Sequence, residues 1–241
     1  MIEKLGIIVS ATNYGETSKI LNILTEDGII GVMAKGCRQL KSPLRSFTEI
    51  MTYGVFQLNY KEDKLSILRS VDITDSFNNI KKDILKISYA GYILKLSSQV
   101  IKQNNNPLVF TYLIDTLKKI DEGFDPLVIT NILELKYLDF LGVMPILDRC
   151  SVCGSTTGIE TLSIDKGGYV CINCIKGENV VSDKTIKLIR MFYYLDISKI
   201  TKMEIKEISK IEINSFLEGY YDKHTGLFLQ RKDFNEQLKR I

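Results

Sequence analysis

Four of the five cysteines in the chain lie in one short segment, CSVCGSTTGIETLSIDKGGYVCINC, at residues 150–174. They form two Cys-x-x-Cys pairs, Cys150 with Cys153 and Cys171 with Cys174, and seventeen residues separate the pairs. Each pair can direct two sulfur atoms to one point, so two pairs supply the four thiolates of a tetrahedral zinc site. The spacing therefore predicts a segment that folds around one metal ion, because it is too small to bury a core of its own.

The start of the chain lacks the features of a secretory signal. Glu3 comes early, no long apolar run follows, and no small-residue cleavage pattern is in place. No stretch approaches the roughly 20 uninterrupted apolar residues of a membrane helix. We therefore expect a cytoplasmic protein, in which thiols stay reduced and paired cysteines favour metal over disulfides.

A shell of four cysteines is closed and leaves no position for substrate or activated water, so we expect a structural role for the metal. An iron–sulfur centre also uses four cysteines and is an alternative. The single histidine, His224, is fifty residues beyond Cys174, and we interpret it as a helix-end residue. Cys37 stands apart and is expected to be a small buried apolar residue or a reduced free thiol.

The first 75 residues have the pattern of short strands. Two apolar runs meet at Glu26-Asp27-Gly28, where Asp-Gly suits a tight hairpin turn. Residues 52–73 repeat this design, with alternating side chains on both sides of the charged turn KEDK. Five or so strands with almost no helical signal predict a small closed or partly closed barrel.

After these strands, the apolar residues change to helical spacing. We expect one helix with Ser76 as a possible N-cap, and two more that begin after Asn106 and Asp125, because each of these is followed by proline. Residues 182–241 again have helical spacing. The cysteine segment therefore interrupts a helical domain.

The basic residues of the barrel are concentrated locally. The net charge is only +3, but residues 33–47, MAKGCRQLKSPLRSF, contain four basic side chains and no acidic one. A barrel with such a loop is a common solution for binding single-stranded nucleic acid, although a solvated basic loop is an equally simple interpretation. The candidate phosphate contacts are Lys35, Arg38, Lys41 and Arg45, with Lys61, Lys64 and Arg69 on the last hairpin. The candidate stacking residues are Phe47, Tyr53 and Tyr60, each of which fits a core position better.

Common catalytic motifs are missing from the sequence. It has no GxxxxGK[ST] loop and no GxGxxG after a strand, and its one histidine has no evident triad partners. An acid–base site made of distant carboxylates stays open. We expect a binding protein and not an enzyme.

Three segments together resemble the RecO family of bacterial recombination mediators. GETSKILNILTEDGIIGVMAKGCRQLKSPL, at residues 15–44, is similar to that family's barrel signature. LELKYLDFLGVMPILDRCSVCG, at residues 133–154, is similar to its helix that leads through a G-x-x-P turn into a zinc knuckle. LFLQRKDF, at residues 227–234, stands where the family has a final basic helix.

The resemblance implies an α+β multidomain fold. An N-terminal OB-fold β-barrel, residues 1–78, would bind nucleic acid and be followed by an all-α domain, residues 79–149 and 178–241. A four-cysteine zinc finger with one structural Zn2+, residues 150–177, would be inserted into that domain.

The resemblance also implies a function in DNA repair and homologous recombination. The protein would bind single- and double-stranded DNA and anneal complementary strands. With RecR, it would help to load RecA onto strands coated with single-strand binding protein, whose C-terminal tail would dock on the helical domain. We expect a cytoplasmic, nucleoid-associated protein with no membrane partner.

Two other classes stay open at this point. One is a zinc-ribbon RNA-binding or transcription-associated module. The other is a metal-dependent hydrolase that acts on nucleic acid.

Overall fold

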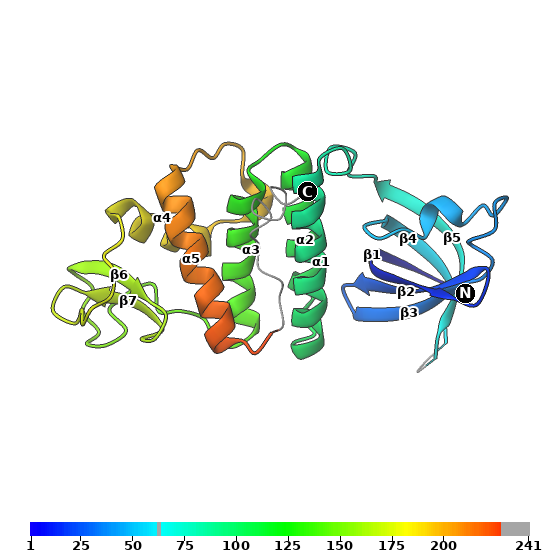
Figure 1. Ribbon diagram of the computed structural model, residues 1–241. Coiled ribbons are helices and arrows are strands. Elements are labelled where there is room, and N and C mark those ends of the chain that lie inside the picture. The colour runs from blue at the N-terminus through cyan, green and yellow to red at the C-terminus, as the bar shows by residue number, and fades with distance from the viewer. Residues whose placement is uncertain (62–63, 228–241) are drawn as a thin grey trace. The chain divides into compact units, whose positions relative to one another are not determined.

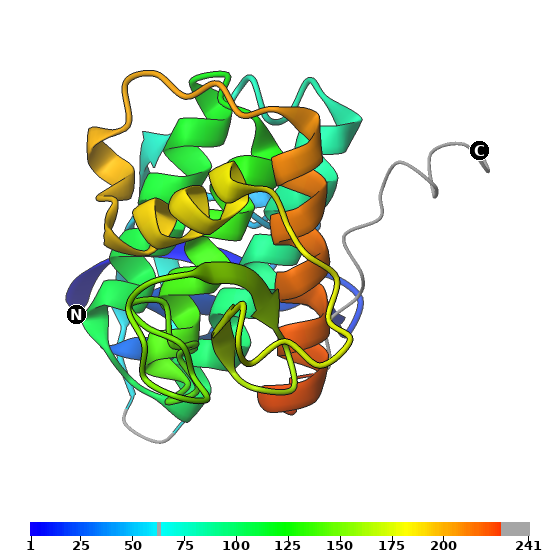
Figure 2. The ribbon, with the colours of Figure 1, turned by 90° about the vertical axis from the view of Figure 1, so that its left-hand side faces the viewer.

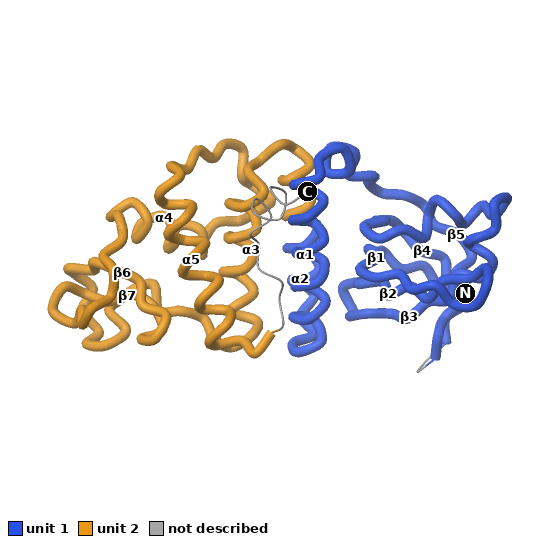
Figure 3. Tube along the Cα trace, viewed as in Figure 1, with its two compact units in different colours: residues 1–114 blue, residues 115–241 orange. Residues whose placement is uncertain are grey.

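The structure is a computed structural model that describes residues 1–61 and 64–227 (Figures 1 and 2). Two compact units make up the chain, residues 1–114 and residues 115–241 (Figure 3). The first contains a β-barrel, the helix that follows it and the first half of the next helix, and the second contains the remaining helices and a small β-hairpin. None of the helices in the described part of the chain combines the length and apolar character needed to cross a bilayer.

Five strands form a closed barrel in the order β1-β2-β3-β5-β4. Their bounds are β1 Ile2–Tyr14, β2 Ser18–Thr25, β3 Gly28–Ala34, β4 Tyr53–Asn59 and β5 Ser66–Asp75. Neighbouring strands are antiparallel except for β3 and β5, which close the barrel as a parallel pair. This five-stranded OB-like barrel confirms the predicted fold of the N-terminal region.

The long strand β1 serves two neighbours. Its first half, to Ile7, pairs with β4, and the second half, from Ile7 onward, pairs with β2. The β1–β2 register shifts between Ile8 and Ser10, which marks an irregularity of the kind that bends a strand. This bend lets one strand pass from one neighbour to the other, so the sheet can close without a free edge.

Alternating strand residues fill the barrel. The buried core consists of Ile8, Leu21, Ile23, Val32, Ala34, Cys37, Phe56, Leu58, Leu68 and Val71. Cys37 is only 1% exposed, which confirms its interpretation as a small buried residue. The tight turn between β2 and β3 is also confirmed, since Gly28 has a φ of 114°.

The first helix, α1 (Ile84–Gln103), begins later than predicted. Its N-cap is Asp83, whose carboxylate accepts hydrogen bonds from the backbone N–H groups of Leu85 and Lys86. The assignment of Ser76 as the cap is wrong, because the next residue, Phe77, is fully buried and has a φ of 46°, outside the helical region. A short turn therefore separates the barrel from α1.

Contacts within the first unit hold α1 to the barrel. The Asn105 side chain, just beyond the helix, donates to the Asp27 carbonyl at 3.2 Å in the β2–β3 turn. The helix α1 also packs against β3 and β1. The compact unit includes α1 and extends to residue 114. The boundary at residue 78, between the barrel and the helical domain, stays a prediction.

The caps of the next two helices are as predicted. α2 (Pro107–Asp121) follows Asn106, whose side chain accepts from the Leu108 N–H at 3.0 Å. α3 (Pro126–Phe140) follows Asp125, which accepts from the N–H groups of two first-turn residues. Proline at the first helical position lacks the N–H that would otherwise be unpaired there.

The second unit is completed by two helices, α4 (Asp183–Tyr194) and α5 (Glu207–His224), and by the hairpin of β6 (Ile159–Ser163) and β7 (Gly168–Cys171). Two short 3-10 helices are η1 (Arg45–Phe47), in the first unit, and η2 (Ile197–Lys199), in the second.

Polar contacts join the helices of the second unit. Lys210 of α5 forms an ion pair with Asp125 at the start of α3, at 2.5 Å. Glu212 of α5 accepts from the N–H and the hydroxyl of Ser182, the N-cap of α4. The predicted final basic helix around Arg231 and Lys232 lies outside the described residues.

Candidate metal centre and nucleic-acid interface

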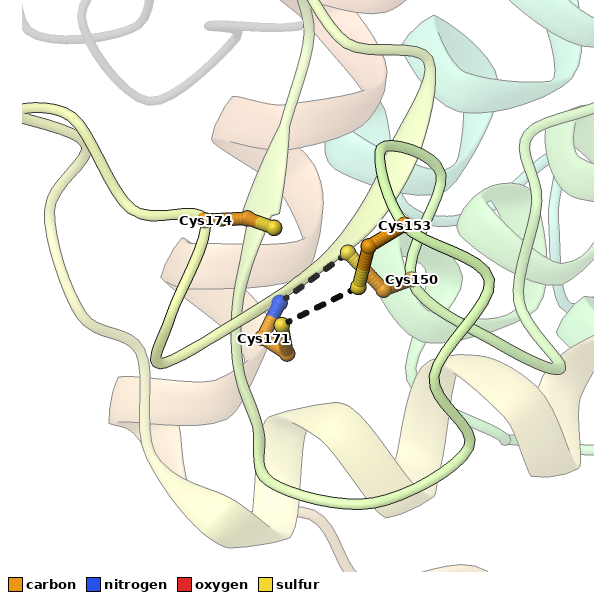
Figure 4. A group of neighbouring side chains, drawn as sticks. All are labelled: Cys150, Cys153, Cys171 and Cys174. Carbon is orange, nitrogen blue, oxygen red and sulfur yellow. Dashed lines mark hydrogen bonds between the residues drawn. The ribbon is translucent and has the colours of Figure 1, made fainter.

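The two cysteine pairs converge in the second unit. The sulfur atoms of Cys150, Cys153, Cys171 and Cys174 all lie within 4.8 Å of one another (Figure 4). The Cys153 and Cys171 sulfurs are 3.6 Å apart, and all four residues are free thiols. Four sulfurs bound to zinc at about 2.3 Å in a tetrahedron would be about 3.8 Å apart, so the donor set fits this ion. The cluster predicted from the sequence is thus confirmed as a site that could hold a metal.

Each pair lies on a similar turn. The N–H of Gly154 donates to the Cys150 carbonyl, and the N–H of Cys174 donates to the Cys171 carbonyl, both at 2.9 Å. Gly154 has a φ of 76°, which the tight turn after the first pair requires. The Cys171 N–H also points at the Cys150 sulfur, at 3.4 Å. This hydrogen bond connects the turn of the second pair to a sulfur atom of the first pair.

The thiols differ in acidity. Burial raises the pKa of Cys150, but the backbone N–H groups of Cys153, Cys171 and Val152 outweigh it and lower this pKa to about 6. The pKa of Cys174 is raised to about 12, chiefly by its hydrogen bond with Cys153 and then by burial. A bound dication would favour the thiolate form at every one of the four cysteines.

The hairpin between the pairs is tied back to the cluster and to the helices. Lys166 lies in the turn of this hairpin. Its ammonium group donates to the Cys174 carbonyl at 2.9 Å and forms an ion pair with Glu178. The hydrogen bond from Lys166 lowers the pKa of Glu178 to about 2. His224, the last residue of α5, contacts the Ile164 carbonyl at 2.8 Å, and this confirms its place at a helix end. The finger is thus anchored on α5.

A third strand-like segment completes the hairpin. Ile146 and Gly168 form an isolated parallel bridge, with the Tyr169 N–H donating to the Ile146 carbonyl at 2.9 Å. A Cβ at Gly168 would lie 2.3 Å from that carbonyl oxygen. This close contact joins the segment before the first cysteine pair to β7, the strand that ends at the first cysteine of the second pair.

We predict that Gly168→Ala destabilises the second unit by about 2 kcal/mol or more, through the clash with Ile146 and the φ of 145°. Thermal unfolding of the variant measures this effect. Gly177→Ala is the matched control, because its φ is also positive, 97°, but its Cβ meets no atom within 4 Å. Equal loss of stability in both variants would contradict the role of the Ile146 contact.

The basic loop after β3 is attached to the β1–β2 turn. The Arg38 N–H donates to the Thr17 carbonyl at 2.8 Å, and its guanidinium donates to the Gly15 carbonyl at 3.2 Å. Lys41 and Arg45 are exposed further along the same loop, on successive turns. Within the described residues, no acidic side chain pairs with Lys35, Arg38, Lys41 or Arg45. Their charges are therefore available to a ligand.

The parallel pairing of β3 and β5 is short. Its register pairs Val32 with Ser66 and Met33 with Ile67, and Lys35 and Arg69 each follow two residues further along the chain. Both of these side chains are exposed.

The β4–β5 turn carries two more exposed lysines. Lys61 and Lys64 line a cavity of about 500 Å³ together with Tyr60 and with residues 29–31 of β3. These two lysines thus lie beside the first half of β3, whereas the basic loop follows its end.

The three candidate aromatic residues differ in exposure. Tyr53 is only 5% exposed, and its ring stacks on Phe77 with centroids 6.0 Å apart. Phe47 packs against the barrel core. Tyr60 is 49% exposed and lies beside Lys61. Only the last of the three has a ring surface open to a base.

The chain thus combines an OB-like barrel, a fold that commonly binds oligonucleotides, with a helical region that contains a four-cysteine cluster able to hold a metal. Two family models cover nearly all of the chain. "Recombination protein O N terminal" matches residues 1–77, and "Recombination protein O C terminal" matches residues 81–233. The chain belongs to the RecO family of DNA repair proteins.

Full-length relatives agree with this assignment. The chain is 34% identical to the DNA repair protein RecO of Bacillus subtilis, with 98% of the chain and 94% of the relative covered. It is also 34% identical to that of Bacillus pumilus, with 100% and 96% covered, and 30% identical to that of Listeria monocytogenes, with 98% and 94% covered. Membership in the family supports a role in DNA repair and recombination.

Proposed function

We propose that the protein binds single- and double-stranded DNA on the basic edge of its barrel and anneals complementary strands. The basic edge consists of Lys35, Arg38, Lys41, Arg45, Lys61, Lys64 and Arg69. The observation that carries the proposal is the loop after β3, where four exposed cations have no acidic partner within the described residues. Annealing needs no bond chemistry, because cations that neutralise both strands reduce their repulsion. The protein is therefore not an enzyme in this proposal.

Tyr60 supplies a stacking surface on the same edge. Its exposed ring lies beside Lys61 and Lys64 along the cavity next to β3. Stacking of a base on an aromatic side chain contributes about 1–3 kcal/mol and tolerates any sequence. This tolerance suits a protein that pairs strands of arbitrary sequence.

The proposed partners are those of the family's recombination pathway. With RecR, the protein would help to load RecA onto strands coated with single-strand binding protein, and it would hold the C-terminal tail of that protein on its helical domain. The proposed metal is one zinc ion with a structural role, and the proposed location is the cytoplasm, in association with the nucleoid. Family membership over nearly the whole chain supports these assignments.

We predict that the purified protein accelerates annealing of complementary DNA strands, both bare and coated with single-strand binding protein. Fluorescence quenching between labelled strands measures the rate. Matched RNA strands separate the alternative of an RNA-binding module, because a DNA annealer does not require the 2′-OH. No acceleration with DNA, preference for RNA, or shortened strands in the presence of divalent ions would each contradict the proposal.

A further inference from the structure

A second basic groove lies within the first unit, between α1 and the outer side of the barrel. It encloses a cavity of about 320 Å³. The helix contributes Lys95, Ser98 and Lys102, and the strands contribute Ser10 and Asn22 among others. We propose that this groove, called the α1 groove below, binds the phosphate backbone of a single DNA strand that continues from the basic edge. The inference rests on the proposed DNA-binding function.

Helical spacing presents the two lysines to one ligand. Lys95, Ser98 and Lys102 follow one another at i, i+3 and i+7, which places them on one face of α1. The ammonium-bearing residues are about 10 Å apart along the helix axis, as seven steps of about 1.5 Å require. Both lysines are exposed, and neither forms an ion pair within the described residues.

The other polar groups of the α1 groove suit an anion. The Asn22 amide donates to the Ser10 hydroxyl oxygen at 2.8 Å, so the Ser10 hydroxyl can in turn donate its hydrogen to a ligand. The residues that line the groove include no carboxylate. Two like charges beside neutral donors attract phosphate and repel a cation.

The α1 groove and the cavity beside Tyr60 have one lining residue in common. Ile29 of β3 lines this groove and also lines the cavity that contains Tyr60, Lys61 and Lys64. A strand that stacks on Tyr60 can therefore pass over Ile29 and reach Lys102 or Lys95. The shared residue Ile29 favours a nucleic-acid strand over an acidic peptide, because an acidic peptide in the α1 groove would need no neighbouring basic cavity.

The double variant Lys95→Ala/Lys102→Ala tests the proposal. Fluorescence anisotropy is used to measure its affinity for a long oligonucleotide, about 30 nucleotides, and for a short one of about 8 nucleotides, which one barrel can cover. Loss of two phosphate contacts is expected to reduce the salt slope, d log K/d log[salt], by about 1.4 on the long strand. On the short strand, which the basic edge alone can hold, affinity should change little.

The variant Lys81→Ala/Lys82→Ala is the charge-matched control. These two exposed lysines precede α1 and lie outside the groove. An unchanged salt slope for the α1-groove variant on the long strand would overturn the inference, as would an equal loss in the control. Failure of the wild-type protein to bind either oligonucleotide would instead overturn the proposed function.

Discussion

Cys171→Ala is expected to abolish stoichiometric metal binding and to unfold the finger. The wild-type protein should contain one zinc ion per chain, and the variant close to none. Zinc binding stabilises small Cys-ligated domains by about 10–16 kcal/mol at neutral pH, and a two-stranded hairpin such as β6–β7 is marginal without such support. Elemental analysis measures the metal, and limited proteolysis between residues 150 and 174 measures the loss of local structure.

Cys37→Ala is the matched control for this experiment. Cys37 is the one cysteine outside the cluster and is buried in the barrel, so its loss should leave the metal content unchanged. The small cavity should cost about 1 kcal/mol of barrel stability. Iron with a visible chromophore in the wild-type protein would contradict zinc, and full zinc content in the Cys171 variant would contradict the assignment of the ligands.

Lys35→Ala/Arg38→Ala/Lys41→Ala is expected to weaken binding to single-stranded DNA by on the order of 10- to 100-fold at low salt. Each lost phosphate contact removes about 0.7 from the salt slope, so the triple variant should have a slope smaller by about 2. The three side chains are exposed and have no acidic partner within the described residues, so the fold should persist. Titration at several salt concentrations measures both effects.

Lys199→Ala/Lys202→Ala/Lys206→Ala removes the same charge from the second unit. Two of these lysines already pair with neighbouring carboxylates, Asp196 and Glu204, so their replacement should change DNA binding much less. If both triple variants lose affinity equally, the effect is one of net charge, and the basic edge is not the binding surface.

Local chemistry was predictable from the sequence wherever neighbouring residues decide it. The proline after Asn106 and after Asp125 marked two helix starts correctly, because the cap and the first turn are adjacent in the chain. The prediction of Ser76 as a cap, which no following proline supports, is wrong. Phe77 after it is buried in a left-handed conformation, and the cap of α1 is Asp83.

Exposure was harder to predict than secondary structure. Tyr53 is the first residue of β4, and Tyr60 comes directly after its last residue. Tyr53 is nevertheless buried against Phe77, whereas Tyr60 is exposed. Lys95 and Lys102 could not be singled out, because helical spacing shows that they share a face but not that this face lies along the barrel.

The cysteine cluster was predictable from the sequence alone, since two short turns bring each pair of sulfurs together and the spacing between the pairs allows one shared site. The sequence also determined the barrel's strands through their alternation. The neighbours of the cations depend instead on long-range packing. Lys61 and Lys64 lie beside residues 29–31 of β3, and the α1 groove exists because α1 packs beside β1 and β3. Such long-range pairings depend on the burial of many side chains at once, which a local pattern does not specify.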